Sequence, residues 1–133
     1  MELLSEVFIA DACALIAFHG AGRPIMSQAG IGAMRGGDVA VSAVTIWEIT
    51  RKVSLGKLSP LHGQDQRGCV AFLRERGYRL LPFTPDHAER TNALPPHHAD
   101  PMDRMIIASA LAEGMTVVTS DRIFAAYGVP MLW

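Results

Sequence analysis

The sequence has few cysteines and few aromatic residues, and neither sign of charge dominates it. Its 133 residues include two cysteines, twelve basic and thirteen acidic residues, and only 7% aromatic residues. Cys13 and Cys69 stand alone, so they favour buried thiols in a reducing compartment over a disulfide framework or a zinc site. A formal net charge of −1 argues against a tight, non-specific DNA binder, although an enzyme that holds RNA briefly needs only local basic patches.

Long hydrophobic runs are also missing. The apolar run 7–18 is interrupted by Asp11 and is too short to span a bilayer. The first residues carry Glu2 and Glu6 and lack the basic region of a signal peptide, so we expect a cytoplasmic protein with no membrane segment. Half of the residues are hydrophobic and 19% are charged, which with this length predicts one compact domain over residues 1–133.

Short apolar segments alternate with helical patterns along the chain, and glycine or proline bounds most of them. We expect strands at 7–10, 38–42, 78–83, 115–119 and 129–132. We expect helices at 12–19, 23–35, 45–55 with a cap at Ser42 or Thr45, 64–76, 84–94, 100–114 and 121–126. Strands that alternate with helices predict an α/β fold with a parallel sheet covered on both faces.

The segment 100–114 has the most clearly marked ends. Asp100 can cap the helix, Pro101 suits the first helical position, and Gly114 can end the helix in a left-handed conformation. Asp103 falls on the face that the helix buries, together with Ile107. The carboxylate of Asp103 could merely stabilise the helix dipole, or it could serve a metal or a reacting group in front of the helix.

Three further carboxylates follow expected strands. Asp11 comes directly after the first strand, Glu48 lies in the helix after the second, and Asp121 follows the fourth. Ligands of parallel sheets bind beyond the carboxyl ends of the strands, and Asp103 can join this set only if its helix points there. Alone, Asp11 and Asp121 could be helix caps, and Glu48 could pair with Lys52.

A cluster of these four residues would have a definite chemistry. Carboxylates that lie close together raise one another's pKa values unless cations are bound. An all-oxygen ligand set suits Mg²⁺ or Mn²⁺, and such ions activate water for in-line attack on a phosphodiester.

In this order and spacing, the residues resemble those of PIN-domain ribonucleases, specifically the toxins of VapBC-type toxin–antitoxin pairs. The Asp-Pro-x-Asp-Arg run at 100–104, followed by Ile-Ala, is the most specific part of this resemblance. The other matching segments are 8–11, 42–49, 55–58, 81–84 and 117–121.

The resemblance implies a PIN-like three-layer α/β/α sandwich with a parallel sheet of about five strands. It also implies a Mg²⁺- or Mn²⁺-dependent endoribonuclease that cleaves single-stranded loops of RNA, dimerises through its helices and is blocked by a cognate antitoxin. The family's four acidic positions match Asp11, Glu48, Asp103 and Asp121. Thr119 matches a position that often carries a hydroxyl near the metal. Ala12 departs from the family, which commonly has Thr or Ser there.

Other polar residues near these segments have two readings. Asp100 could cap its helix or supply an outer carboxylate near the metal. Side chains that could hold RNA phosphates or antitoxin carboxylates are Arg51, Lys52, Arg104 and Arg122. His97 and His98 are interpreted as a polar loop, because adjacent side chains of an extended segment point to opposite sides. We expect Trp47 and Trp133 to be packing residues.

Three alternative functions fit the sequence less well. A phosphoacceptor receiver domain generally needs an acidic pair after its first strand and a late lysine, but Asp11 precedes Ala12-Cys13 and no lysine follows Lys57. A catalytically silent PIN-fold protein that binds RNA or a partner would have no use for the intact acidic set. A DNA nuclease of the wider PIN group usually carries insertions for which this chain has little room.

Overall fold

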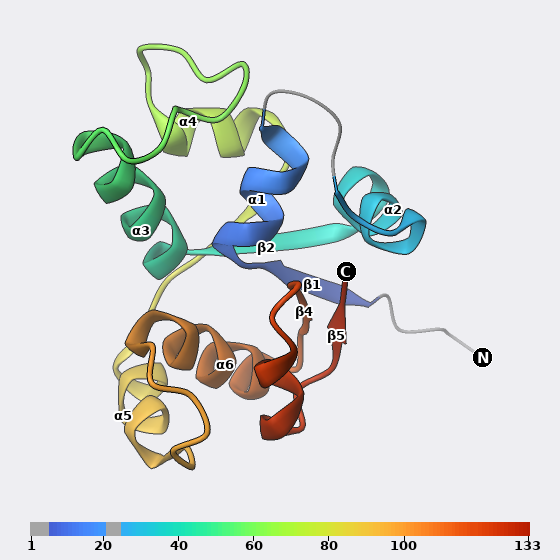
Figure 1. The fold of residues 1–133 in the computed structure, drawn as a ribbon, viewed down its shortest axis with the longest axis vertical. Coiled ribbons are helices and arrows are strands. Elements are labelled where there is room, and N and C mark those ends of the chain that lie inside the picture. Colours follow the sequence, from blue (N-terminus) through green and yellow to red (C-terminus); the bar gives the residue numbers. More distant parts are fainter. Residues whose placement is uncertain (1–5, 21–24) are drawn as a thin grey trace.

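The computed structural model describes residues 6–20 and 25–133, and they form a three-layer α/β/α sandwich (Figure 1). Within these residues, all neighbouring strands of a five-stranded sheet run parallel, in the order β3-β2-β1-β4-β5. The strands are β1 (Val7–Ala10), β2 (Asp38–Ser42), β3 (Arg79–Leu81), β4 (Thr116–Val118) and β5 (Met131–Leu132). The expected α/β class, the three layers and the strand number are therefore confirmed.

The helices divide between the two faces of the sheet (Figure 1). One face is covered by α1 (Ala12–His19), α2 (Gln28–Gly36), α3 (Ala43–Ser54) and α4 (Cys69–Glu75). The other face is covered by α6 (Pro101–Glu113) and the 3₁₀ helix η1 (Arg122–Tyr127), and α5 (Pro85–Ala93) packs on α6.

Alternation along the strands builds the two cores. In β1, Phe8 and Ala10 face the core under α1–α4, whereas Ile9 faces the core under α6. β2 repeats the pattern, with Val39 on the first side and Ala40 on the second. Since successive side chains of a strand point to opposite faces, a sheet covered on both sides needs continuous apolar strands. The polar residues therefore gather where the strands end.

The helix expected at 45–55 begins at Ala43 with Ser42 as its cap, and the helix expected at 121–126 is a 3₁₀ helix. Two other expected helices begin several residues later than expected. The helix expected at 64–76 begins only at Cys69, because Asp65 accepts a hydrogen bond from the Arg67 amide and Gly68 has a φ of 97°, which together form a turn. The helix expected at 23–35 begins at Gln28 after the Ser27 cap, and its expected start at 23–24 lies outside the described residues.

Two further expectations concern cysteines and membranes. Cys69 is buried as expected, but the prediction for Cys13 was wrong, because α1 presents this side chain to solvent. Among the described parts of the chain, none of the helices combines the length and the apolarity that crossing a bilayer requires.

Candidate metal centre

The carboxyl edge of the sheet brings acidic residues from separate segments together. Asp11 directly follows β1, Asp121 follows β4, and Glu48 lies on α3 after β2. Helix α6 places Asp103, in its first turn, near the same edge, and the charge of Asp103 therefore contributes to the raised pKa values of both Asp11 and Glu48. Asp103 thus lies near the other carboxylates, and within the part of the chain that the structure describes it groups most tightly with Asp121 and His98, whereas Asp11 and Glu48 lie outside that tight group.

Asp11 is the most deeply buried carboxylate of the group, with 4% of its surface exposed. Its Oδ1 accepts a hydrogen bond from the Ala14 amide at 2.8 Å, so it caps α1. Burial, with a smaller contribution from the charges of Asp103 and Glu48, raises the pKa of Asp11 to about 6 against the opposing effect of hydrogen bonds from Thr119 and Ala14. Capping and membership of the cluster are thus compatible roles.

Glu48 and Asp103 are also partly shielded from solvent. Burial raises the pKa of Glu48, and the nearby charges of Asp103 and Asp100 act in the same direction. Lys52, with its Nζ 3.7 Å from Glu48 Oε2, lowers it. For Asp103, burial, Asp100 and Asp121 raise the pKa, and His98 lowers it. The helical pair of Glu48 and Lys52 therefore exists without removing Glu48 from the cluster.

Thr119 and Asp121 complete the edge after β4. The Thr119 side chain is fully buried, hydrogen-bonds Asp11, and accepts a bond from the Asp121 amide at 3.1 Å. Asp121 Oδ1 accepts from the Ile123 amide at 3.1 Å and so caps η1. Asp100 caps α6, since its Oδ1 accepts from the amides of Met102 and Asp103 at 2.8 and 3.1 Å.

Sequence reasoning missed His98. Its Nε2 lies 2.8 Å from Asp103 Oδ2 and 3.3 Å from Asp121 Oδ2, and one ligand atom from each of the three residues falls within 4.8 Å of the others. The rings of the two adjacent histidines have different partners, since His97 packs against Tyr127 and His98 contacts the carboxylates. His98 lies in the expected polar loop, but its ring also contacts two carboxylates of the acidic cluster, which the sequence interpretation did not include.

The four basic residues singled out in the sequence have different surroundings. Arg104 is directed into the chain, where its guanidinium donates to the backbone carbonyls of 91, 94, 95 and 98 and to the Tyr127 hydroxyl. Lys52 faces Glu48, as described above. Arg51 and Arg122 are exposed, and the Arg51 guanidinium lies 5.4 Å from the centre of the Trp47 ring.

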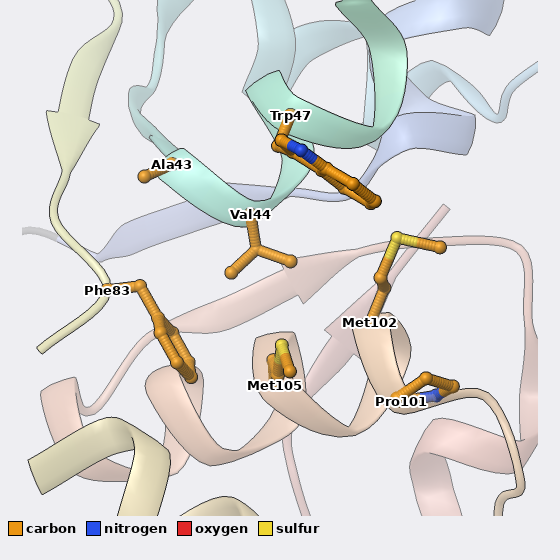
Figure 2. A pocket seen from close by; sticks show the side chains of 7 residues that line it. All are labelled: Ala43, Val44, Trp47, Phe83, Pro101, Met102 and Met105. Atoms are coloured by element: carbon orange, nitrogen blue, oxygen red, sulfur yellow. The ribbon is translucent and has the colours of Figure 1, made fainter. Parts of the chain in front are cut away.

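An apolar hollow lies between α3 and α6 (Figure 2), the two helices that also carry Glu48 and Asp103. Trp47 precedes Glu48 on α3 and Met102 precedes Asp103 on α6, so the same two helices serve both features. The cavity measures about 550 Å³ and is lined by Ala43, Val44, Trp47, Phe83, Pro101, Met102 and Met105. Trp47 is 54% exposed at its edge, so the expectation that this residue is a packing residue was wrong. Trp133 is partly buried against the core under α1–α4, as expected.

The donor set fits a divalent cation. Burial, together with the charges of neighbouring carboxylates, raises the pKa values of Asp11, Glu48 and Asp103, so ionising all three is unfavourable until a cation compensates their charges. Oxygen-rich sites of this kind suit hard ions such as Mg²⁺ or Mn²⁺.

Fold and site together define a parallel three-layer α/β protein with an acidic centre at the carboxyl edge of its sheet. The family model of the PIN domain matches residues 8–130, and the chain belongs to the PIN-domain family. Members of this family are typically nucleases and generally use divalent metal ions.

Solved structures show the same fold. FitAcB from Neisseria gonorrhoeae is 18% identical with a TM-score of 0.65, and the match covers 95% of this chain and 96% of that one. VapBC2 from Rickettsia felis, bound to a DNA fragment from its promoter, is 16% identical with a TM-score of 0.67 and coverages of 94% and 96%. A toxin–antitoxin complex from Klebsiella pneumoniae is 21% identical with a TM-score of 0.64, covering 97% of each chain. Comparison with curated protein sequences returned no match.

Proposed function

We propose that this chain is a metal-dependent endoribonuclease and the VapC-type toxin of a toxin–antitoxin pair, acting in the cytoplasm as one PIN domain over residues 1–133. The observation that carries this proposal is the convergence of carboxylates from four separate segments at one edge of the sheet. The family membership and the likeness to toxin–antitoxin structures support it.

Asp11, Glu48, Asp103 and Asp121 would hold one or two Mg²⁺ or Mn²⁺ ions. A bound ion of this kind orients a water molecule, lowers its pKa and offsets the charge that develops on the scissile phosphate. Thr119 keeps the carboxylate of Asp11 and the backbone of Asp121 in place through its two hydrogen bonds. If a metal-activated water is the nucleophile, cleavage would leave 5′-phosphate and 3′-hydroxyl ends.

The RNA substrate and the antitoxin would meet the same face of the molecule. Arg51 and Arg122 are exposed close to Glu48 and Asp121 in the sequence, so they are suited to phosphates of RNA. We assign the same surface to an antitoxin segment that covers the acidic centre. Arg104 is not part of this set, because five acceptors within the chain already engage its guanidinium.

A second copy of the chain is the partner we propose for the apolar hollow. A two-fold symmetric interface needs a projecting group and its complementary recess on the same face. Trp47 projects at the edge of a recess lined by Phe83, Met102 and Met105, and this combination meets that requirement (Figure 2).

The decisive experiment is cleavage of a mixed pool of structured RNAs by the purified protein with Mn²⁺, Mg²⁺ or EDTA. Asp11→Ala and Asp103→Ala remove two carboxylates of the centre, and Asp86→Ala is the matched control because Asp86 is exposed and pairs only with Arg90 on α5 among the described residues. We expect the wild type and Asp86→Ala to cleave RNA with Mn²⁺. We expect no cleavage by either protein in EDTA, and none by Asp11→Ala or Asp103→Ala with Mn²⁺.

Each other outcome changes the conclusion. Equal trace cleavage by the wild type and both site variants identifies a contaminating nuclease. Cleavage of single-stranded or branched DNA in place of RNA would favour the DNA nuclease alternative. A folded wild-type protein that cleaves neither substrate with either ion would favour the catalytically silent binding protein.

A further inference from the structure

The carboxylates of the acidic centre share one structural feature: the chain holds one oxygen of each by a hydrogen bond or an ion pair. Asp11 Oδ1 accepts from the Ala14 amide, and Asp121 Oδ1 accepts from the Ile123 amide. Both donors are free backbone amides at the start of a helix, where they have no partner within the helix. A ligand that is fixed through one oxygen can offer the other to a cation in a constant position.

Asp103 cannot be held in this way. It lies inside the first turn of α6, and the Asp100 side chain already accepts from the amides of Met102 and Asp103. The donor to Asp103 must therefore come from another segment. His98 supplies it, since its Nε2 lies 2.8 Å from Asp103 Oδ2 and also 3.3 Å from Asp121 Oδ2.

The hydrogen-bond network assigns the tautomer of the His98 ring. Nδ1 is the acceptor for the Asp100 backbone amide at 3.3 Å, so this nitrogen carries no proton. In a neutral imidazole the proton then resides on Nε2, which faces the two carboxylates. His98 is thus arranged as a donor toward Asp103 and Asp121, and its Nε2 lone pair is not available to a metal.

Contacts on both sides keep His98 in this position. Its backbone amide donates to the Tyr127 hydroxyl at 2.8 Å, and its carbonyl accepts from Arg104 at 3.4 Å. Its ring lies edge-on to the ring of Phe124, with 6.4 Å between the centroids. The side chain is only 17% exposed. The loop before α6 is therefore pinned to both α6 and η1, and the ring has little freedom to turn away.

We propose that His98 is a positioning residue of the metal centre, whose Nε2–H holds Asp103 Oδ2 and contacts Asp121 so that both carboxylates keep the arrangement a divalent cation requires. This inference rests on the proposed function only in that the centre binds a divalent cation. Hydrogen-bond partners of metal ligands typically contribute 10- to 100-fold to affinity.

The test measures Mn²⁺ binding to EDTA-stripped full-length protein by titration calorimetry, with unfolding curves to verify that each variant folds. His98→Ala removes the donor, whereas His98→Gln keeps an N–H group of similar reach. His62→Ala is the matched control, because His62 is an exposed histidine in another loop. We expect His98→Ala to weaken Mn²⁺ binding about 10- to 100-fold, His98→Gln to restore most of the affinity, and His62→Ala to bind as the wild type does.

A second measurement follows the ring itself and does not depend on a variant that folds. In ¹⁵N-labelled wild-type protein, the ring nitrogens of His98 should report a proton on Nε2 both before and after Mg²⁺ is added. Loss of that proton on Mg²⁺ binding, or a Gln variant as weak as the Ala variant, would mean that His98 ligates the metal and would overturn the proposal. Unchanged affinity in His98→Ala, or a wild type that binds no Mn²⁺, would overturn it as well.

These outcomes are separate from the failure of the nuclease assignment. If the variants change Mn²⁺ affinity as expected while no RNA is cleaved, the role of His98 stands and the endoribonuclease proposal fails. If RNA is cleaved and His98→Ala binds Mn²⁺ as the wild type does, the endoribonuclease proposal stands and the proposed role of His98 fails.

Discussion

Replacing Asp11 by Asn should stabilise the metal-free protein at high pH and have much less effect at low pH. Burial raises the pKa of Asp11 from its ordinary value of 3.8 to about 6. The folded state therefore binds this proton more tightly than the unfolded state, so ionising Asp11 disfavours folding. The penalty is nearly absent below pH 3.8, grows as the pH rises, and is complete above pH 6.

The size of the effect follows from the same two values. A shift of about two pKa units corresponds to about 3 kcal/mol above pH 7 and to about 1 kcal/mol at pH 4.5. Asparagine has nearly the same shape and can still accept from the Ala14 amide, but its weaker hydrogen bonds offset part of the gain. We expect Asp11→Asn to raise the free energy of unfolding by about 1–3 kcal/mol at pH 8.

Urea unfolding in EDTA at pH 4.5 and pH 8 measures this difference. The control is Asp86→Asn, an exposed position on α5 where neither pH should matter. Mn²⁺ at about a thousand times its dissociation constant should reverse the order at pH 8, because a ligand that binds only the folded wild type then adds about 4.1 kcal/mol to the free energy of unfolding. An Asp11→Asn protein that is less stable than the wild type at pH 8 in EDTA, or a gain that does not change with pH, would refute the reasoning.

Three further predictions concern other parts of the molecule. Arg104→Met should lower the free energy of unfolding by about 2–3 kcal/mol, because it leaves backbone carbonyls before α6 without their hydrogen-bond donor. A loss of less than about 0.5 kcal/mol, measured by urea unfolding, would contradict this role. Trp47→Ala on α3 should shift the protein from dimer to monomer in light scattering, whereas Leu111→Ala, at an exposed apolar position on α6, should leave the mass unchanged. Equal masses for wild type and Trp47→Ala would refute the proposed interface. Gly114→Ala should lower the free energy of unfolding by about 1 kcal/mol, because Gly114 ends α6 with a φ of 68° that alanine adopts only with strain. Gly32→Ala inside α2 is the control and should not destabilise the protein, since the added methyl group meets no other atom within 4 Å at either position.

Local chemistry made much of the fold predictable. The ends of α6 depend on Asp100, Pro101 and Gly114, which act on neighbours within a few residues, and the structure places its cap and its left-handed end at these positions. The strands were recognisable because a sheet covered on both faces needs continuous apolar runs. One failure was also local: the turn at Asp65 and Gly68 shortened α4 through a hydrogen bond that hydrophobic periodicity does not indicate.

The sequence by itself determined the order of strands and helices along the chain, the caps, and the placing of Asp11, Glu48 and Asp121 after strand ends. Only the tertiary structure decided the rest. Placing β1 between β2 and β4 brings these residues to one edge, and the direction of α6 adds Asp103. The partners of His98 and Arg104 and the exposure of Trp47 depend on contacts between segments that packing joins, and no spacing within one segment specifies such contacts.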